Sequence, residues 1–455
     1  MLYDSEKRDI SLVLTGDIMT TRRLSVFSED RYLQLREIVR SAEVRFANFE
    51  STAREYDKGS PSLMDGTFMT TEPRLLKDVD WFGFNLLSCA NNHAFDYGEE
   101  GVLETIRNLD EAGFVHAGTG TNLRQARSPA YLDTPGGRVA LIAATSFFRE
   151  WNQAGEQRPD SRGRPGVNPL GFKKSYVIDR QGMADLRRLG AALGFDADRE
   201  RLRKFGFSAP AESGADTGED YQFAGQKFKA GEKFAVQTKV NEKDAAGNLT
   251  QLREARRQAD WVIVSLHYHE MGGESLLTAQ KRTELDEGAA FFGDFARRCI
   301  DEGADMVVGH GPHHPLGVEI YKGKPIFHGL GNFILQNETV RFLPDLSYTK
   351  FNLSKEATPA DFLDARSDGD KAAHPADPLF WQALCAKCKF TSGKLSQVLI
   401  YPVDLGFGRP RPQRGRPMLP DAENGEKIIA RIARLSRKLG TEISYRDQCG
   451  VVALA

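Results

Sequence analysis

Cysteine is scarce in this sequence. The chain has five cysteines in 455 residues, an odd number without the regular spacing of a disulfide framework. Small secreted domains that depend on disulfides are rich in regularly spaced cysteines, so the pattern does not indicate that class and fits a reducing compartment. Cys89 and Cys299 are predicted to be small core residues.

Cys385 and Cys388 form a lone CxxC pair. A structural zinc at this pair would need two more ligands, for which His374 and Cys449 are the candidates. A redox dithiol normally follows a strand and opens a helix, and the sequence around this pair does not have that pattern. Two incidental cysteines are therefore the favoured interpretation.

Long apolar runs and an excess of one charge are also missing. No segment is apolar enough for a signal peptide or a membrane span, so a cytoplasmic location is expected. The formal net charge of −2 gives no reason to expect nucleic acid as a partner. A content of 40% hydrophobic and 10% aromatic residues is typical of a globular protein with a substantial core. The sequence leaves the oligomeric state open.

Strand-like and helical patterns alternate along the chain. Such alternation predicts βαβ units and a largely parallel sheet covered on both faces, which is an α/β fold. The predicted strands are Ile10–Leu14, Val44–Asn48, Asn85–Ala90, Val139–Ala143, Trp261–Leu266 and Met306–Val308, followed by a hairpin from Val318–Tyr321 to Pro325–Leu330. The predicted helices are Arg31–Arg40, Gly101–Ala112 and Thr278–Glu302.

Two stretches interrupt this alternation. Residues 150–258 are predicted to form an insertion, either a solvated excursion or a lid over the active site, and residues 343–377 are a second irregular stretch. The tail, residues 394–455, has the pattern of a strand, an amphipathic helix at Asn424–Leu439 and a final strand at Glu442–Leu454. We expect this tail to complete a single domain that spans residues 1–455.

Four predicted strands end at residues that can bind a metal. In chain order these residues are Asp17, Asn91-Asn92-His93, His267 and Gly309-His310-Gly311-Pro312-His313-His314. Open α/β sheets bind their ligands at the carboxyl ends of the strands, so the pattern brings these separated residues to one place. It predicts a single metal-dependent active site.

Three side chains could offer oxygen ligands to a metal, and for Asp17 and Glu50 a role without a metal is also considered. Asp17 follows Gly16 at a strand end and suits a metal, although it could equally cap the next helix. Glu50 could lie between two metals as a hard anionic ligand, whereas a surface glutamate is the commoner explanation. Asn92 could offer its side-chain carbonyl, because adjacent amides are poor core residues.

His93 and Asp96 are predicted to be the catalytic residues. His93 could act as a general acid toward a leaving group while Asp96 fixes the tautomer of its ring. The alternative is an asparagine-rich turn with a capping aspartate.

Histidines supply the remaining donors. His267 and His269 are expected to point to opposite faces, with His267 toward the site and a core histidine as the alternative. His310 and His313 are predicted ligands, because three histidines within five residues of a glycine-rich bend are improbable as packing. The side chains assigned to substrate binding are Asn91, His269, His314 and His328.

This mixed set of oxygen and nitrogen donors suits two divalent transition ions, Mn, Zn or Fe. Two such ions close together can bind a transferring oxygen and lower the pKa of bound water. The predicted chemistry is metal-assisted hydrolysis.

Six motifs occur in a characteristic order, namely Gly16-Asp17, Asn48-Phe49-Glu50, Asn91–Gly98, Gly309–His313, Lys322–Phe327 and Leu330–Phe333. Together they resemble the CapA family of capsule and poly-γ-glutamate biosynthesis proteins, which is related to the calcineurin-like metallophosphoesterases. The resemblance implies a four-layer α/β/β/α sandwich and a dinuclear metal centre. The ligands that it implies are Asp17, Glu50, Asn92, His267, His310 and His313, with His93 as the catalytic histidine.

The resemblance also implies a hydrolase for a phosphoester or a γ-glutamyl or peptide amide, with a small molecule, a peptide or poly-γ-glutamate as substrate. Two features depart from the phosphoesterase pattern. Ile18-Met19 follows Asp17 where Asp-x-His is expected, and His310-x-x-His313 replaces His-x-His. A metal-dependent peptide epimerase or amide ligase, and a non-catalytic assembly protein with a degraded metal site, are therefore kept as alternatives.

Overall fold

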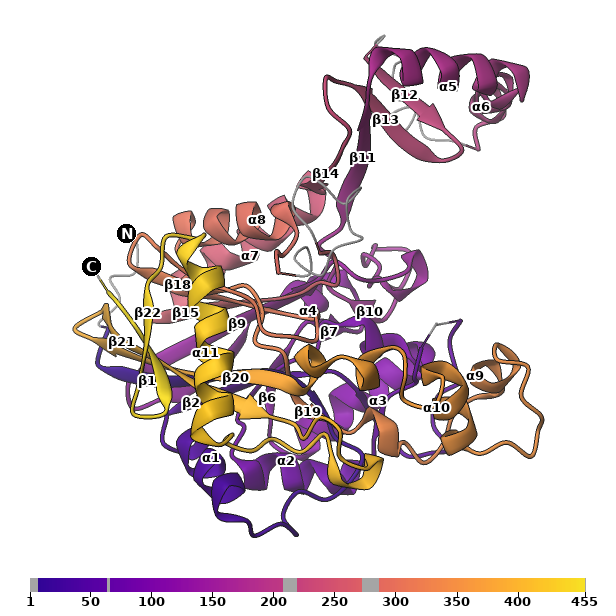
Figure 1. Ribbon diagram of the computed structural model, residues 1–455. Coiled ribbons are helices and arrows are strands. Elements are labelled where there is room, and N and C mark those ends of the chain that lie inside the picture. The colour runs from indigo at the N-terminus through magenta and orange to yellow at the C-terminus, as the bar shows by residue number, and fades with distance from the viewer. Residues whose placement is uncertain (1–6, 64–65, 208–218, 272–285, 455) are drawn as a thin grey trace. The chain divides into compact units, whose positions relative to one another are not determined.

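The structure is a computed structural model that describes residues 7–63, 66–207, 219–271 and 286–454. The chain divides into two compact units (Figure 1). The first comprises Met1–Gly171, Glu242–His269 and Asp294–Ala455, and the second comprises Phe172–Asn241 and Glu270–Gly293. Every predicted site residue belongs to the first unit.

In the described part of the first unit, the larger sheet has nine strands. Neighbours run in the order β22-β23-β21-β20-β1-β2-β5-β6, and β19 pairs with the carboxyl end of β1. Strands β1, β2, β5 and β6 are parallel, and the C-terminal strands extend the sheet in antiparallel fashion. The strands are β1 Ile10–Met19, β2 Val44–Phe49, β5 Leu86–Ser88, β6 Val115–Ala117, β19 Asn332–Leu335, β20 Gln382–Thr391, β21 Lys394–Asp404, β22 Ile443–Arg446 and β23 Cys449–Val452.

The second sheet of this unit has six described strands in the order β17-β18-β16-β15-β9-β8. The four inner strands are parallel, and each edge strand joins its neighbour as an antiparallel hairpin. The strands are β8 Ala130–Thr134, β9 Gly137–Thr145, β15 Trp261–His267, β16 Met306–His310, β17 Val318–Tyr321 and β18 Lys324–Phe327. Largely apolar runs such as Trp261–Leu266 form these inner strands because both of their faces are buried.

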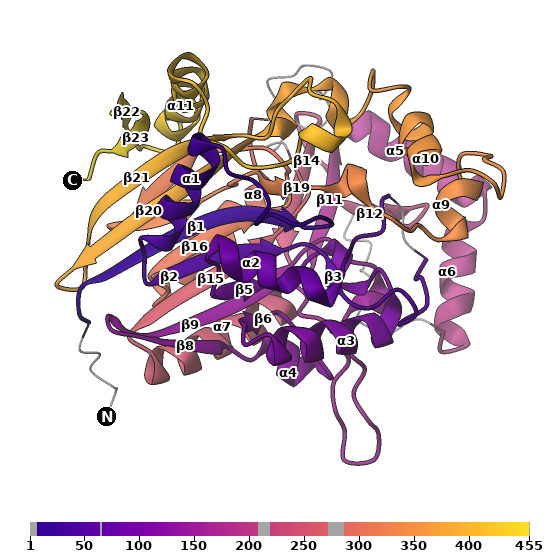
Figure 2. The same cartoon turned by 90° about the horizontal axis from the view of Figure 1, so that it is seen from below.

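The two sheets share one hydrophobic cluster. Leu12, Leu14 and Phe46 of the larger sheet pack in it with Ile263 and Met306 of the second sheet, and all five are fully buried. The alternation of side chains in a strand sends Val13 to the other face, where it packs with helices α1 Asp30–Arg40 and α2 Leu76–Phe82 (Figure 2). Truncation of a fully buried side chain such as Phe46 to alanine costs about 3–5 kcal/mol.

Further helices pack around these sheets. Helix α7 packs against β9 and β15, and α11 packs against the C-terminal strands β21, β22 and β23. The helices of the first unit not yet given are α3 Gly98–Glu111, α4 Leu123–Arg127, α7 Glu242–Gln258, α9 Asp345–Thr349, α10 Pro359–Ser367 and α11 Ala422–Arg437, and α8 spans Ala290–Asp301. Short pairs β3 Thr52–Ala53 with β4 Thr70–Thr71, and β7 Thr119–Gly120 with β10 Gly166–Val167, complete the unit.

In its described residues, the second unit contains a small sheet in the order β12-β13-β11-β14 and two helices that lie wholly within it. Its elements are β11 Phe172–Ile178, α5 Arg180–Ala192, α6 Phe195–Lys204, β12 Asp220–Phe223, β13 Gln226–Ala230 and β14 Ala235–Val240. Its segment Phe172–Asn241 falls inside the predicted insertion, whereas Glu270–Gly293 lies outside it, and residues 150–171 and 242–258 of the insertion belong to the first unit. A role as a lid stays a prediction.

The structure differs from the sequence expectations in three places. The helix expected at 278–302 is described only as Ala290–Asp301, and residues 278–285 lie outside the described residues. The final strand is a hairpin, because Asp447 and Gln448 adopt positive φ and turn the chain between β22 and β23. The stretch 343–377 contains two helices, the second begun by a capping box of Thr358 and Asp361.

Candidate metal centre

The carboxyl ends of four strands from both sheets meet at one place. Asp17 of β1 pairs in register with Asn48 of β2 and Asn332 of β19, and His267 of β15 pairs with His310 of β16. Parallel strands end at the same edge of a sheet, so the polar residues that follow the apolar runs come together.

Gly16 allows this close approach. A Cβ atom at Gly16 would lie 1.8 Å from the carbonyl oxygen of Gly331, so no other residue fits without a shift of the backbone. The next amide, that of Asp17, donates a hydrogen bond of 3.0 Å to the same oxygen. The glycine therefore fixes Asp17 beside the turn that leads into β19.

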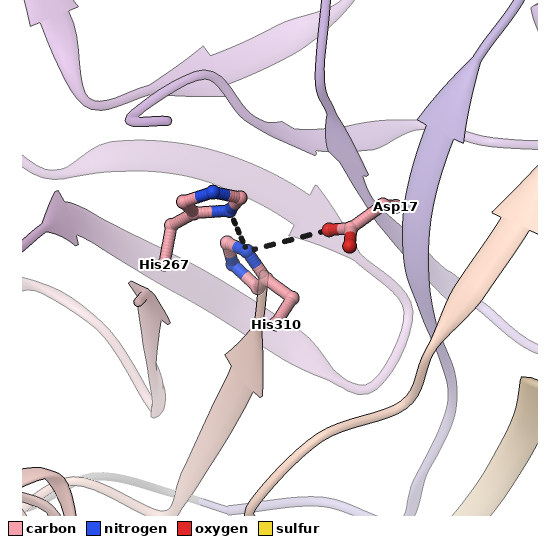
Figure 3. Close-up of side chains that lie close together, drawn as sticks. All are labelled: Asp17, His267 and His310. Atoms are coloured by element: carbon pink, nitrogen blue, oxygen red, sulfur yellow. Dashed lines mark hydrogen bonds and ion pairs between the residues drawn. The ribbon is translucent and has the colours of Figure 1, made fainter. Parts of the chain in front are cut away.

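Asp17, His267 and His310 form the first group of donors (Figure 3). Nδ1 of His310 lies 2.9 Å from Nδ1 of His267 and 3.7 Å from Oδ1 of Asp17. The other nitrogen of His310 lies 2.6 Å from Oγ of Ser265. Burial lowers the pKa of His310 to about 4, so its ring is neutral near neutral pH and able to bind a metal.

Glu50 gives the clearest indication that the site fits a cation. Its side chain is fully buried, and neither carboxylate oxygen has a hydrogen-bond partner among the described residues. Oε1 lies 3.9 Å from Nε2 of His93, 3.8 Å from Nε2 of His267 and 3.9 Å from Nε2 of His313. Two ligands that each lie ~2.1 Å from one ion are separated by roughly 3–4 Å.

Without a cation this carboxylate is unfavourable in its charged form. Burial, and then the charge of Asp17, raises the pKa of Glu50 well above its ordinary value. Asp17 has a lowered pKa, because contacts with His313, His310 and Asn48 outweigh the effect of its burial. The donor set thus fits a divalent cation, which would replace the missing partner of Glu50.

His269 lies on the same side as His267, so the expectation of opposite faces was wrong. The two Nε2 atoms are 3.0 Å apart, and Nε2 of His267 also lies 2.8 Å from Oδ1 of Asn92. Residues two apart in a strand share a face, and it is the residue between them, Tyr268, that points away and donates a hydrogen bond to the carbonyl of His328. His269 joins Glu50 and His267 as a group able to hold a metal.

His313 is held in a strained bend. Its φ of 62° is in the left-handed region, which costs a non-glycine residue on the order of 1 kcal/mol. Nδ1 of His313 lies 2.9 Å from Oδ1 of Asn332, and the amide nitrogen of Asn332 donates to the carbonyl of His313 at 2.9 Å. This double contact leaves Nε2 of His313 directed toward Glu50.

His93 and Asp96 form the contact that the sequence spacing predicted. Oδ2 of Asp96 lies 2.7 Å from Nδ1 of His93 and also accepts a 2.7 Å hydrogen bond from the amide of Met69. Nε2 of His93 is thereby directed toward the centre, 3.9 Å from Glu50. The geometry suits a ring whose tautomer is fixed by a carboxylate.

Three residues assigned to substrate binding are enclosed by other protein groups. The amide nitrogen of Asn91 donates to the carbonyl of Phe49, and its oxygen accepts from the amide of His93. His314 is buried with its ring beside that of Phe380, and Nε2 of His328 lies 3.2 Å from a carboxylate oxygen of Glu319. These contacts are structural.

A cavity of about 410 Å³ opens onto the centre, a volume in the range of small-molecule sites. Asn92, His93, His269 and His313 line it on one side. The other side is formed by the helical stretch that follows β19, and includes Lys350, Phe351, Phe362, Arg366 and His374.

Sequence reasoning missed several of the residues that shape this site. Asn48 donates a 2.8 Å hydrogen bond to Asp17, and Asn332 fixes His313. Asn48 and Asn332 lie within two of the six motifs, so the sequence did mark their positions. The ring of His374 lies 5.1 Å from that of His313, and no local pattern predicted this long-range contact.

The CxxC pair does not form a metal site. Cys385 and Cys388 lie three residues apart on β20 and pack into different hydrophobic clusters, on opposite faces of the sheet. All five cysteines are free and buried, including Cys89 and Cys299, as expected of core residues.

Fold and site together define a mixed α/β protein with buried groups of His, Asp and Glu that could hold a metal ion. Residues 11–337 match the family of the bacterial capsule synthesis protein PGA_cap. The chain therefore belongs to this family, and CapA proteins of Bacillus are among its homologues.

The chain is also similar to individual proteins. Protein y4sH of Sinorhizobium fredii is 30% identical over 457 residues, which cover 98% of this chain and 93% of that protein. The capsule biosynthesis protein CapA of Bacillus anthracis is 23% identical over 359 residues, covering 78% of this chain and 66% of that protein. A solved structure of a hypothetical protein from Thermus thermophilus is similar with a TM-score of 0.38 and 14% identity, covering 87% of this chain and 99% of that one.

Among the described residues, no helix combines the length and the apolar character needed to cross a membrane.

Proposed function

We propose that this chain is a metal-dependent hydrolase with a dinuclear centre, acting on a phosphoester or on a γ-glutamyl or peptide amide in capsule-type or poly-γ-glutamate metabolism. The observation that carries the proposal is the buried carboxylate of Glu50, which has no hydrogen-bond partner among the described residues and lies within 3.9 Å of three imidazole nitrogens. The names of the CapA relatives, which refer to capsule and PGA biosynthesis, support the choice of pathway.

The donors would form three overlapping groups. These are Asp17, His267 and His310; Glu50, His267 and His269; and Asp17, Glu50 and His313. Asn92 adds an amide oxygen 2.8 Å from His267. The two sheets with helices on their outer faces support the four-layer sandwich of the metallophosphoesterases as the fold type.

Divalent ions at such a centre supply Lewis-acid polarisation of the bond to be cleaved and lower the pKa of water. The protein contributes acid catalysis through His93. Asp96 lies against Nδ1 and would stabilise the doubly protonated ring of His93, whose Nε2–H could donate its proton to a leaving group in the cavity. The buried surroundings of Asp17 and Glu50 exclude bulk water and strengthen these electrostatic effects.

The test uses the full chain, stripped of metal with a chelator and reloaded with Mn, Zn or Fe. We expect turnover of at least one member of a panel of phosphomonoesters, phosphodiesters and γ-glutamyl peptides, dependent both on the metal and on His93. A metal-loaded protein that cleaves none of them would contradict the proposal. Exchange of deuterium into Cα of a peptide without cleavage would point to the epimerase alternative instead.

A further inference from the structure

Arg366 is a half-buried cation that no described carboxylate neutralises. It lies in the last turn of α10, and burial lowers the pKa of its guanidinium. Among the described residues, its hydrogen-bond acceptor is Oγ1 of Thr67. Burial of an unpaired charge is costly, so such a group is normally retained where a partner of opposite charge binds.

Neighbouring arginines show the ordinary arrangement. Arg414 pairs with Glu338 and with Asp370, the latter at 2.9 Å, and Arg411 pairs with Asp370 at 2.7 Å. Glu338 lines the same small recess as Arg366, but its carboxylate is already bound by Arg414. Among the described residues, the carboxylates nearest to this recess are therefore engaged by other arginines, and Arg366 has no ion pair.

That cavity is the one that opens onto the candidate metal centre. Arg366, Thr67 and His374 line it together with His93 and His313. Arg366 therefore borders the same cavity as His93 and His313, but it belongs to the helical stretch that follows β19 rather than to the metal donors. A substrate whose reactive bond lies at the centre would bring a second group toward Arg366.

We propose that Arg366, positioned by Thr67, binds an oxyanion of the substrate, a carboxylate or a phosphate group distinct from the bond that reacts. The planar guanidinium has five N–H donors in a fork that matches such oxyanions, and only one acceptor from the described part of the protein engages it. The position of this subsite in a reaction rests on the proposed function. A γ-glutamyl substrate carries such a carboxylate next to its amide.

The first experiment measures binding of two probes, glutarate and inorganic phosphate, to the full chain by titration calorimetry. Metal-free protein is used in one series, so that the probes do not report on metal, and metal-loaded protein in a second. We expect Arg366→Gln to weaken binding of the preferred probe in the metal-free series at least tenfold, with a smaller loss in Thr67→Val. Arg341→Gln is the control, because this exposed arginine pairs with Glu72 and lines a different recess.

Preference for glutarate would assign the subsite to a carboxylate, and preference for phosphate would assign it to a phosphate group. Equal affinities in wild type and Arg366→Gln, or no binding of either probe to wild type, would overturn the inference. The unfolding temperature of Arg366→Gln should not fall, because the change removes an unpaired, half-buried charge, whereas loss of a purely structural arginine would lower it. Arg366→Lys should retain part of the affinity.

A kinetic experiment separates this inference from the proposed function. Arg366→Gln should raise KM at least tenfold with little change in kcat if the arginine binds a remote group of the substrate. Unchanged KM in an active enzyme would overturn the subsite and leave the hydrolase intact. Probe binding that depends on Arg366 in a protein without hydrolytic activity would support the subsite and contradict the proposed hydrolase.

Discussion

Oε1 of Glu50 lies 3.8 Å from Nε2 of His267, and no described residue donates a hydrogen bond to either oxygen of this carboxylate. A fully buried carboxylate in this setting is stabilised only by a cation or by its own proton. The spacing between the two atoms is that of two ligands of one ion rather than that of a hydrogen bond.

Glu50→Gln should therefore lower the metal content of the protein. Glutamine keeps the size of the side chain and removes the charge, so the fold is retained while an anionic donor is lost. We expect wild type to hold two ions per chain and the variant to lose at least one, measured by elemental analysis after dialysis. Glu319→Gln, which changes a buried carboxylate away from the centre, should leave the metal content unchanged. Equal metal content in wild type and Glu50→Gln would argue against a metal at this carboxylate.

His93→Ala should reduce kcat by about 10²–10⁴-fold, the range of general acid–base catalysis. The metal content should stay close to that of wild type, since the ring is held mainly by Asp96 through Nδ1. Steady-state kinetics with the best substrate of the hydrolase panel provides the measurement. Asp96→Asn should give a smaller loss, because His93 is kept but its tautomer is no longer fixed. An unaltered kcat in His93→Ala would remove this residue from the reaction.

Much of the first unit was predictable because its inner strands are largely apolar. Strands β1, β2, β15 and β16 have both faces buried, so composition alone marks them. Their carboxyl ends carry the polar residues, and the topology of parallel strands then brings these together. All six predicted ligand residues lie within one cluster of contacts, although their binding of metal stays a prediction.

The other wall of the cavity could not be predicted in this way. Arg366 and His374 lie in a stretch with weak apolar periodicity, and only tertiary contacts bring them beside His313. A local signal was nevertheless present, since Thr358 and Asp361 have the spacing of a capping box and mark the start of α10. The error about His269 had a different origin. Residues two apart in a strand point to the same face, but His267 and His269 were expected to point to opposite faces.

Asn332→Ala should weaken metal binding about 10–100-fold, the usual effect of removing a group that orients a ligand. The amide of Asn332 contacts both the ring and the carbonyl of His313, whose backbone is strained. Competition with a chromophoric chelator measures the affinity. Asn85→Ala is the matched control, because this half-buried asparagine also bonds to backbone groups but lies at the start of its strand, away from the centre. An equal loss in both variants would indicate a general effect on the fold.

Glu319 and His328 give a prediction for the dependence of stability on pH. Burial alone would raise the pKa of Glu319, but its contacts with His328 and Arg297 outweigh this effect and hold the pKa below the ordinary value of 4.5. A carboxyl group with a lower pKa in the folded chain stabilises the fold above its unfolded pKa, and this stabilisation is lost as the pH falls through the folded pKa.

Glu319→Gln should accordingly lower the free energy of unfolding near pH 7 by roughly 1 kcal/mol, after allowance for solvent screening of Arg297. The difference from wild type should shrink as the pH is lowered below about 4.5, because the wild-type carboxyl group is then protonated as well. Urea unfolding of both proteins between about pH 7 and about pH 3 measures it. A difference that stays constant over this range would mean that the ion pair does not stabilise the fold. His328→Ala should leave KM unchanged, since the structure gives this ring to Glu319 rather than to the cavity.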